Sequence, residues 1–339
     1  MDDVFDLEED RVKREIVQRK ARRVLIQLPE GLRGQLFKIV ETVESTGAEA
    51  FVSGDPCYGA CDLPLEEAGK LNVDLIIHYG HTELLSEVGF PVVYVKAKAR
   101  TPVSGVVKKS LSLLKKYDVI GLTTTAQHLD RLSEAVKVLK EGGKEVLIGD
   151  SKGALHPGQV LGCDYRNALA ISDGVDAFLF IGGGRFHALG IALSTRKPTY
   201  VADPFTGSVY SVNEEADKVI RQRFACILEA RNAETIAVIV GLKPGQFRLS
   251  LAMKAAEEFK KKGKRTSILT LRELSPEVLS QFPSIDAFVN TACPRVSIDD
   301  ASRFKVPVLT VSESLVVLGK LTWEELCQRG LFLDVSWRS

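Results

Sequence analysis

Three cysteines that could share one metal centre lie far apart in the chain. Cys61, Cys163 and Cys293 each follow a short β-branched run that predicts a strand, and each belongs to a different third of the 339 residues. Thiolates are the usual ligands of iron–sulfur clusters. Sulfurs so widely spaced can meet only if three similar units turn the same edges toward one point. We therefore predict that these three cysteines hold an iron–sulfur cluster.

The other cysteines leave alternatives open. A lone cysteine is most often a small buried apolar side chain, and the chain lacks the compact paired C-x2-C spacing of common metal sites. Cys226 and Cys327 fall inside predicted helices and are assigned to structure. Cys57 stands in a Cys-x3-Cys spacing with Cys61 and could supply a second ligand from the same loop. A structural zinc site made by Cys57 and the three distant cysteines is one alternative.

Composition limits the function classes. Hydrophobic residues make up 45% and charged residues 26% of the chain, as in ordinary globular proteins. The apolar runs are too short to span a membrane, and the acidic start at 1–10 does not resemble a signal peptide, so a cytoplasmic location is expected. A net charge of +1 gives no bulk electrostatic reason to bind nucleic acid or membrane. Six cysteines in a reducing compartment indicate thiols or metal ligands.

One pattern of strands and helices occurs three times. In each copy a strand, an amphipathic helix that ends at glycine, and a second strand come first. The first strands are expected at 24–27, 119–123 and 236–241, and the second at 50–53, 146–149 and 266–269. The third strand opens each time with an aspartate, and proline introduces the fourth: Asp74, Asp176 and Asp286, then Pro91, Pro198 and Pro307. Three copies with matching punctuation indicate internal triplication.

The predicted fold class is therefore α/β, with three similar domains in a pseudo-threefold arrangement. Each domain is expected to be a small parallel four-stranded sheet flanked by helices. The limits are 1–110 with Cys61, 111–215 with Cys163, and 216–339 with Cys293. A helix is expected over 2–23, helical connectors near 102–116 and 208–232, and a capping box at Thr322 before a last helix.

Polar residues gather where the predicted strands end. In open parallel sheets ligands bind beyond the carboxyl ends of the strands. Cys61 and Cys163 each lie thirteen residues before the shared aspartate, whereas Cys293 lies seven residues after it, so all three fall at this edge. The same edges carry one glutamine, three glycines and four of the five histidines: Gln27, His78, His81, His128, Gly182, Gly183, Gly184 and His187. Glycine there lets backbone N–H groups approach a ligand closely.

These motifs resemble a known family. The Gly54–Asp62 segment with Tyr-Gly-Ala-Cys, the His78–His81 loop, the Gly182–His187 loop and Thr291–Arg295 are similar to archaeal 2-(3-amino-3-carboxypropyl)histidine synthases. The similarity covers essentially the whole chain. That family performs the first step of diphthamide biosynthesis on translation elongation factor 2.

The resemblance implies a 4Fe-4S cluster on Cys61, Cys163 and Cys293, with Cys57 outside the ligand set. One iron would face S-adenosylmethionine, and cleavage would release methylthioadenosine while a 3-amino-3-carboxypropyl radical adds to imidazole C2. The residues expected to contact the cosubstrate are Gln27, His78, Gly182, Gly183, Gly184, Arg185, His187 and Arg295. Elongation factor 2, an electron donor and a second copy of the chain are the implied partners.

Two further alternatives belong to other classes. Quinolinate synthase also holds a cluster with three cysteines from three α/β domains, but it binds a small phosphorylated substrate, and no P-loop occurs here. A non-catalytic α/β ligand-binding protein with incidental cysteines would purify without iron.

Overall fold

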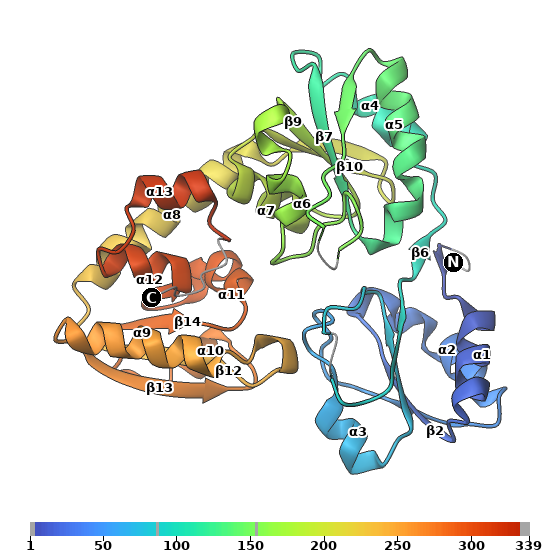
Figure 1. Ribbon diagram of the computed structural model, residues 1–339, viewed down its shortest axis with the longest axis horizontal. Coiled ribbons are helices and arrows are strands. Elements are labelled where there is room, and N and C mark those ends of the chain that lie inside the picture. Colours follow the sequence, from blue (N-terminus) through green and yellow to red (C-terminus); the bar gives the residue numbers. More distant parts are fainter. Residues whose placement is uncertain (1–3, 86–87, 153–154, 333–339) are drawn as a thin grey trace.

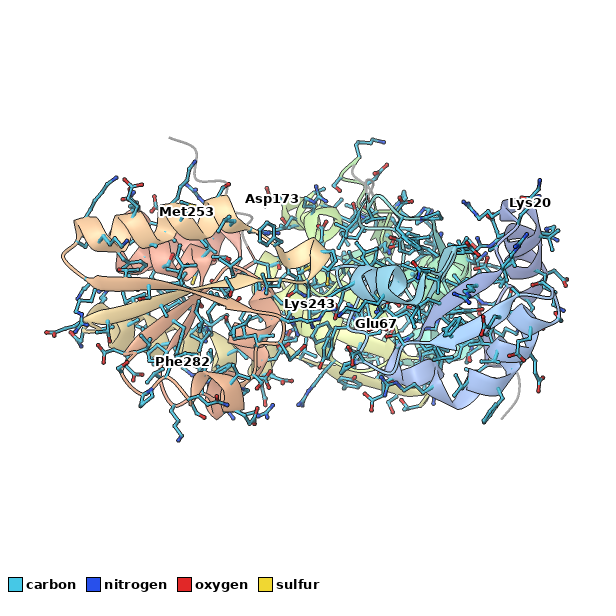
Figure 2. The ribbon with its side chains drawn as sticks, turned by 90° about the horizontal axis from the view of Figure 1, so that it is seen from below. Lys20, Glu67, Asp173, Lys243, Met253 and Phe282 are labelled. Atoms are coloured by element: carbon cyan, nitrogen blue, oxygen red, sulfur yellow. The ribbon has the colours of Figure 1, made fainter. Side chains whose placement is uncertain are left out.

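Each third of the chain forms one sheet, because apolar β-branched runs alternate with amphipathic helices. The computed structural model describes residues 4–85, 88–152 and 155–332. Three lobes, called domains 1, 2 and 3 after their sheets, lie around a common centre (Figure 1). Seen from the side they occupy a single layer (Figure 2). No helix in the described part of the chain is long and apolar enough to cross a membrane.

Domain 1 contains a parallel sheet in the order β3-β2-β4-β5. The domain also contains a separate two-stranded antiparallel sheet, in which β1 pairs with β6. Its elements are β1 (Phe5–Asp6), α1 (Glu9–Arg19), β2 (Arg23–Gln27), η1 (Glu30–Gln35), α2 (Leu36–Glu44), β3 (Glu49–Val52), α3 (Leu65–Leu71), β4 (Leu75–Tyr79), β5 (Val92–Val95) and β6 (Lys98–Ala99).

Domain 2 repeats this order as β8-β7-β9-β10 and adds an antiparallel edge strand, β11. Its elements are α4 (Ser104–Ser110), β7 (Val119–Thr124), η2 (Ala126–Arg131), α5 (Leu132–Glu141), β8 (Glu145–Leu147), α6 (Arg166–Leu169), η3 (Ser172–Gly174), β9 (Ala177–Ile181), α7 (Phe186–Thr195), β10 (Thr199–Asp203), β11 (Ser208–Ser211) and α8 (Asn213–Arg231).

Domain 3 has the order β13-β12-β14-β15, again all parallel. Its elements are β12 (Thr235–Gly241), η4 (Pro244–Gln246), α9 (Leu249–Lys261), β13 (Arg265–Leu271), α10 (Pro276–Leu279), β14 (Ala287–Asn290), α11 (Pro294–Asp299), η5 (Ala301–Arg303), β15 (Val308–Thr310), α12 (Val311–Val317) and α13 (Trp323–Arg329). The expected capping box is present, since Thr322 and Glu325 bond reciprocally at the start of α13.

The aspartate shared by the three copies has the same task in each domain. Asp74 accepts hydrogen bonds from the backbone N–H groups of residues 22 and 23 at 2.7 and 2.9 Å, at the start of the first strand. Asp176 and Asp286 accept equivalent pairs at the starts of β7 and β12. Each aspartate thus ties the third strand of its sheet to the first and fixes their register at the amino end.

The structure corrects three details of the prediction. The helix expected over 2–23 spans only Glu9–Arg19 in α1, because β1 pairs with β6 and Asp6 bonds the N–H of Glu8. Residues 2 and 3 lie outside the described residues. The sheet of domain 2 has five strands, and the connector near 208 begins with β11. The predicted limit at 215 falls inside α8, which packs on both α7 and α12.

Candidate metal centre

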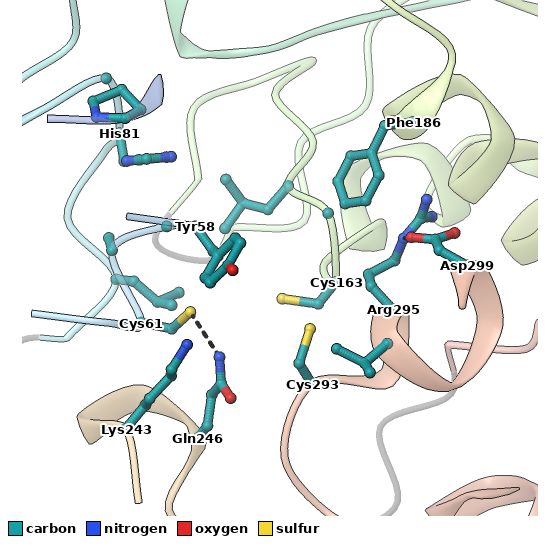
Figure 3. A pocket seen from close by; sticks show the side chains of 18 of the residues that line it. Tyr58, Cys61, His81, Cys163, Phe186, Lys243, Gln246, Cys293, Arg295 and Asp299 are labelled. Carbon is teal, nitrogen blue, oxygen red and sulfur yellow. Dashed lines mark hydrogen bonds and ion pairs between the residues drawn. The ribbon is translucent and has the colours of Figure 1, made fainter. Parts of the chain in front are cut away.

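The carboxyl ends of the sheets border one pocket of about 630 Å³. Cys61 enters it from the loop between β3 and α3, Cys163 from the loop between β8 and α6, and Cys293 from the position directly before α11. Figure 3 shows the three sulfurs directed into this pocket. The structure thus brings together the three cysteines that were singled out from the sequence, one from each domain.

Domain 3 holds the Cys61 loop of domain 1 directly. The N–H of Gly245 donates to the carbonyl of Cys61 at 2.8 Å, and Nε2 of Gln246 donates to its Sγ at 3.4 Å. A Cβ on Gly245 would lie 2.6 Å from the Cα of Cys61, so only glycine permits this approach. The loop after β12 therefore fixes the position of Cys61 in the pocket.

Lys243 supplies a second link between these domains. Its ammonium lies 3.0 Å from Oδ2 of Asp62 and 2.8 Å from Oε2 of Glu273, and it also lies over the ring of Tyr58 at 4.5 Å. The side chain is buried, and it lies near the middle of the molecule (Figure 2). Because this one ammonium binds Asp62 of domain 1 and Glu273 of domain 3, it holds the residues next to Cys61 against domain 3.

The other two cysteines are fixed within their own loops. Asn290 at the end of β14 donates from Nδ2 to the carbonyl of Cys293 at 2.7 Å. The backbone N–H groups of residues 295 and 296 face the Cys293 sulfur, an arrangement that stabilises a thiolate. Cys163 follows Gly162, whose carbonyl accepts a hydrogen bond from Tyr165 Oη at 2.9 Å.

Burial raises the pKa of each thiol, and the pKa of Cys163 rises to about 12. The neighbouring sulfurs of Cys293 and Cys61 add to the shift at Cys163, which reflects how near the three lie. Three thiols in such a site keep their protons until a metal replaces them, so a bound metal removes both the desolvation cost and the mutual repulsion. This donor set fits a soft metal centre bound by thiolates.

Two of the predicted cosubstrate contacts line the pocket. Arg295 is buried, donates from Nε to Oδ2 of Asp299 at 2.8 Å, and stacks its guanidinium on the ring of Phe186 at 3.8 Å. His187 packs between the rings of Phe180 and Phe186. Burial is the main cause that lowers the pKa of His187 to about 3, so this histidine is neutral.

Two other predicted cosubstrate contacts, Gln27 and His78, do not line the pocket but are connected to it by a line of hydrogen bonds. Gln27 donates from Nε2 to the carbonyl of Asp62 at 2.7 Å, and its Oε1 lies 2.6 Å from Nδ1 of His78. Nε2 of His78 lies 2.9 Å from Nδ1 of His81, and His81 lines the pocket. Gln27 and His78 therefore reach the pocket only through His81, which the cosubstrate contacts expected from the sequence did not include.

The remaining predicted contacts are not part of the wall formed by the described residues. Gly182, Gly183 and Gly184 turn the chain between β9 and α7, where the N–H of Gly184 faces Asp203 at 3.4 Å. Arg185 is exposed and pairs with Glu215 at 3.4 Å, away from the pocket. His128 is buried, and neither of its ring nitrogens has a hydrogen-bond partner in the described part of the protein.

Cys57 lies beside His78 and His81. Its sulfur is within 4.8 Å of nitrogens of His78 and His81, and it is not among the described residues that line the pocket. Burial raises its pKa to about 12, with a further contribution from Asp62. A site that uses Cys57 together with all three distant cysteines therefore does not match this geometry.

Several pocket residues were not assigned a role from the sequence. Lys243 and Gln246 lie in the loop after β12, and their partners, Asp62 and Cys61, are more than 180 residues away in the chain. Tyr58 and Asp299 had no signal beyond nearness to a cysteine. Only contact between domains gives these residues a role, and single-chain spacing does not reveal it.

The chain is an α/β protein in which one cysteine from each of three domains lines a common pocket. Residues 28–327 match the family model described as putative diphthamide synthesis protein. The chain therefore belongs to the diphthamide synthesis protein family, which confirms the resemblance drawn from its motifs.

Relatives and solved structures agree. The chain is 37% identical to the 2-(3-amino-3-carboxypropyl)histidine synthase of Pyrococcus horikoshii, over 93% of this chain and 91% of that protein. It is 30% identical to subunit 1 of the human 2-(3-amino-3-carboxypropyl)histidine synthase, over 91% of this chain and 71% of that protein. A crystal structure of Dph2 from Pyrococcus horikoshii with a 4Fe-4S cluster matches with a TM-score of 0.86 and 35% identity, over 96% of this chain and 94% of that one.

Proposed function

We propose that this chain holds a 4Fe-4S cluster on Cys61, Cys163 and Cys293 and uses it to cleave S-adenosylmethionine. One electron breaks the bond between the sulfonium sulfur and the 3-amino-3-carboxypropyl group, which releases methylthioadenosine. The group adds to imidazole C2 of a histidine in translation elongation factor 2, and loss of one electron and of the C2 proton completes the product. The observation that carries the proposal is the meeting of three cysteines from three domains at one pocket. The relatives named for this histidine product, and the cluster in the similar Dph2 structure, support it.

The pocket supplies what the reaction needs from the protein. Cys61, Cys163 and Cys293 would hold the cluster, which when bound would supply the electron for cleavage of the sulfonium and would keep one iron free of protein ligands for the cosubstrate. We assign Arg295 to the carboxylate of the aminocarboxypropyl arm, since its guanidinium is already held in place by Asp299 and Phe186. The exposed ring of Phe186, which lines the pocket, is assigned to contact with the nucleoside. The pocket walls exclude water from the carbon radical.

The proposed partners are elongation factor 2, a reductant and a second copy of this chain. The chemistry requires the first two. The homodimer rests on the family resemblance alone.

An anaerobic assay tests the proposal. The reduced protein is incubated with dithionite, elongation factor 2 and S-adenosylmethionine labelled in its carboxyl group. We expect label in elongation factor 2, methylthioadenosine in solution, and iron and sulfide in the purified protein. 5′-Deoxyadenosine as the main product would contradict the proposed bond cleavage. A colourless, iron-free protein would instead support a non-catalytic binding role, and zinc in place of iron would support a structural site.

A further inference from the structure

A line of hydrogen bonds runs from the backbone of the Cys61 loop to the pocket. It passes from the carbonyl of Asp62 through Gln27 and His78 to His81. Gln27 and His78 are almost fully buried, and His81 ends the line at the pocket surface (Figure 3). Each side chain in this line is hydrogen-bonded to the one before it. The line therefore determines whether the ring nitrogen of His81 that faces the pocket carries a hydrogen or a lone pair.

The direction of each hydrogen bond follows from its first member. The Asp62 carbonyl can only accept, so Gln27 must present its NH2 group to it and its Oε1 to His78. Oε1 can only accept, so Nδ1 of His78 carries a hydrogen. In a neutral ring the other nitrogen is then an acceptor, and Nδ1 of His81 must donate to it. Nε2 of His81 is left with a lone pair at the pocket end.

Burial keeps both rings neutral. It is the largest cause that lowers the pKa of His81 to about 4, against a smaller opposing effect of the Tyr79 carbonyl, and it lowers the pKa of His78 well below its usual value. Besides the two rings themselves, the groups that shift these pKa values include no carboxylate. At neutral pH His81 therefore offers an acceptor and no charge.

We propose that Nε2 of His81 accepts a hydrogen bond from an imidazole N–H of the histidine that this protein modifies, and thereby orients the ring; this rests on the proposed function. The charged groups among the described residues of the pocket lie elsewhere on its wall, and all belong to domain 3: Lys243, Arg272, Glu273, Arg295, Asp299, Asp300 and Arg303. These suit the carboxylate and ammonium of the cosubstrate. A neutral acceptor suits a neutral N–H donor.

The arrangement also determines how the substrate ring is turned. In imidazole, C2 lies between the two nitrogens, so a hydrogen bond to one N–H fixes the direction in which C2 points. His81 is a binding and specificity residue in this scheme. Gln27 and His78 are positioning residues, because they act only by fixing the tautomer of His81.

The tautomers are directly measurable. Selective ¹⁵N-histidine labelling of the protein, with its cluster oxidised, gives signals from only five histidines. Two-bond ¹H–¹⁵N correlation spectra distinguish a ring protonated at Nδ1 from one protonated at Nε2. We expect His78 and His81 to be neutral and protonated at Nδ1. In Gln27→Leu, which removes the acceptor for His78, we expect His81 to shift toward protonation at Nε2. A wild-type His81 protonated at Nε2 would overturn the proposal.

Kinetics test the binding role. His81→Leu removes the acceptor, whereas His81→Gln retains an amide oxygen on a side chain of similar reach. We expect His81→Leu and Gln27→Leu to raise the KM for elongation factor 2 by about 3- to 10-fold, the effect of one lost neutral hydrogen bond. His81→Gln should restore most of the affinity. His156→Gln, an exposed histidine outside the pocket, is the matched control.

The outcomes separate the inference from the function on which it rests. If wild-type protein modifies elongation factor 2 and His81→Leu has an unchanged KM, the inference fails and the function stands. If wild-type protein with a complete cluster does not modify elongation factor 2, the proposed function fails, and the spectra still report the tautomer. Equal losses in His81→Gln and His81→Leu would contradict a role as acceptor.

Discussion

At the scale of single residues, Cys61, Cys163 and Cys293 line one pocket, whereas the other three cysteines are not among the described residues that line it. Cys61 has its carbonyl and sulfur bonded by Gly245 and Gln246 of another domain, and Cys293 faces backbone N–H groups at the start of α11. Cys226 and Cys327 lie within α8 and α13 and are not among the described residues that line the pocket. Donors aimed at a sulfur stabilise a thiolate, but they also occur outside the pocket, since Arg223 donates to Cys226 Sγ at 3.7 Å and the Gly59 N–H faces the Cys57 sulfur. The shared pocket therefore distinguishes the three cysteines, and the donors alone do not.

Cysteine substitutions test this distinction. We expect Cys61→Ala, Cys163→Ala and Cys293→Ala each to lose the cluster, because two thiolates do not hold it firmly. Cys57→Ala should keep it, since that sulfur faces His78 and His81 instead. Iron analysis and the visible absorption of anaerobically purified proteins measure the result. Full iron content in any of the first three variants would refute the ligand assignment.

Gly245→Ala tests the contact between domains. The added Cβ would meet the backbone of Cys61 at 2.6 to 3.1 Å, so the loop that carries this cysteine must move. We expect iron content to fall at least severalfold while the circular dichroism spectrum stays unchanged. Gly31→Ala is the control, because Gly31 also lines the pocket and a Cβ there meets nothing within 4 Å. Equal iron in the two variants would show that the contact does not position Cys61.

The sequence predicted the cysteines but only part of the rest of the site. Cys61, Cys163 and Cys293 were found because a repeated pattern placed them at equivalent edges. Arg295 and His187 were found because they lie near such a cysteine or glycine motif. Lys243 was missed since its roles depend on a carboxylate of another domain. Arg185 was placed in the site by its glycine neighbours, yet Glu215 draws its side chain away.

At the scale of elements, α8 joins domains 2 and 3. It packs on α7 on one side and α12 on the other, and one apolar core extends across both domains. Arg223 of α8 is fully buried and binds Glu313 of α12 through both carboxylate oxygens, at 2.7 and 2.6 Å. The same guanidinium donates to the carbonyls of Ser297 and Val308. It thereby fixes α11, the helix that follows Cys293.

Glu313→Gln is expected to destabilise the fold by about 3–5 kcal/mol, the usual cost of leaving one charge of a buried pair uncompensated. Urea unfolding followed by circular dichroism measures it. Glu313 also closes the capping box of α12 with Thr310, and glutamine preserves that role. Glu325→Gln makes the same change in the exposed capping box of α13 and should alter stability little. A loss in Glu313→Gln no larger than that in Glu325→Gln would mean that the charge of Glu313 in the buried pair contributes little to stability.

Elements were predicted better than their ends and additions. The three sets of four strands follow from apolar runs and from the glycine, aspartate and proline residues that bound them, which are local properties of the sequence. The shortened α1 and the extra β11 depend on pairing between distant segments, Phe5 with Ala99 and Tyr200 with Ser211. Local patterns carry no information on such pairs.

At the scale of the whole molecule, the threefold repeat makes the stability of all three domains depend on pH through equivalent aspartates. The pKa values of Asp74, Asp176 and Asp286 are all lowered from 3.8, the first two mainly by backbone N–H donors and the third mainly by the Thr235 hydroxyl. A carboxyl group whose pKa is lower in the folded than in the unfolded protein stabilises the fold in full when the pH is above its unfolded-state pKa. That contribution is lost as the pH falls through the folded value.

We therefore expect the free energy of unfolding to decrease between pH 5 and pH 3 more steeply in the wild type than in the triple variant Asp74→Asn, Asp176→Asn, Asp286→Asn. Asparagine still accepts hydrogen bonds but does not titrate, so the variant starts less stable and changes less. Urea titrations at a series of pH values measure both curves. The matched control replaces three other exposed aspartates by asparagine: Asp10 in α1, Asp173 in η3 and Asp217 in α8. If its curve flattens as much as that of the first variant, the pH response reflects total charge. If only the first variant flattens, the three strand-joining aspartates are its source, and the repeat is a stabilising device as well as a scaffold for the cysteines.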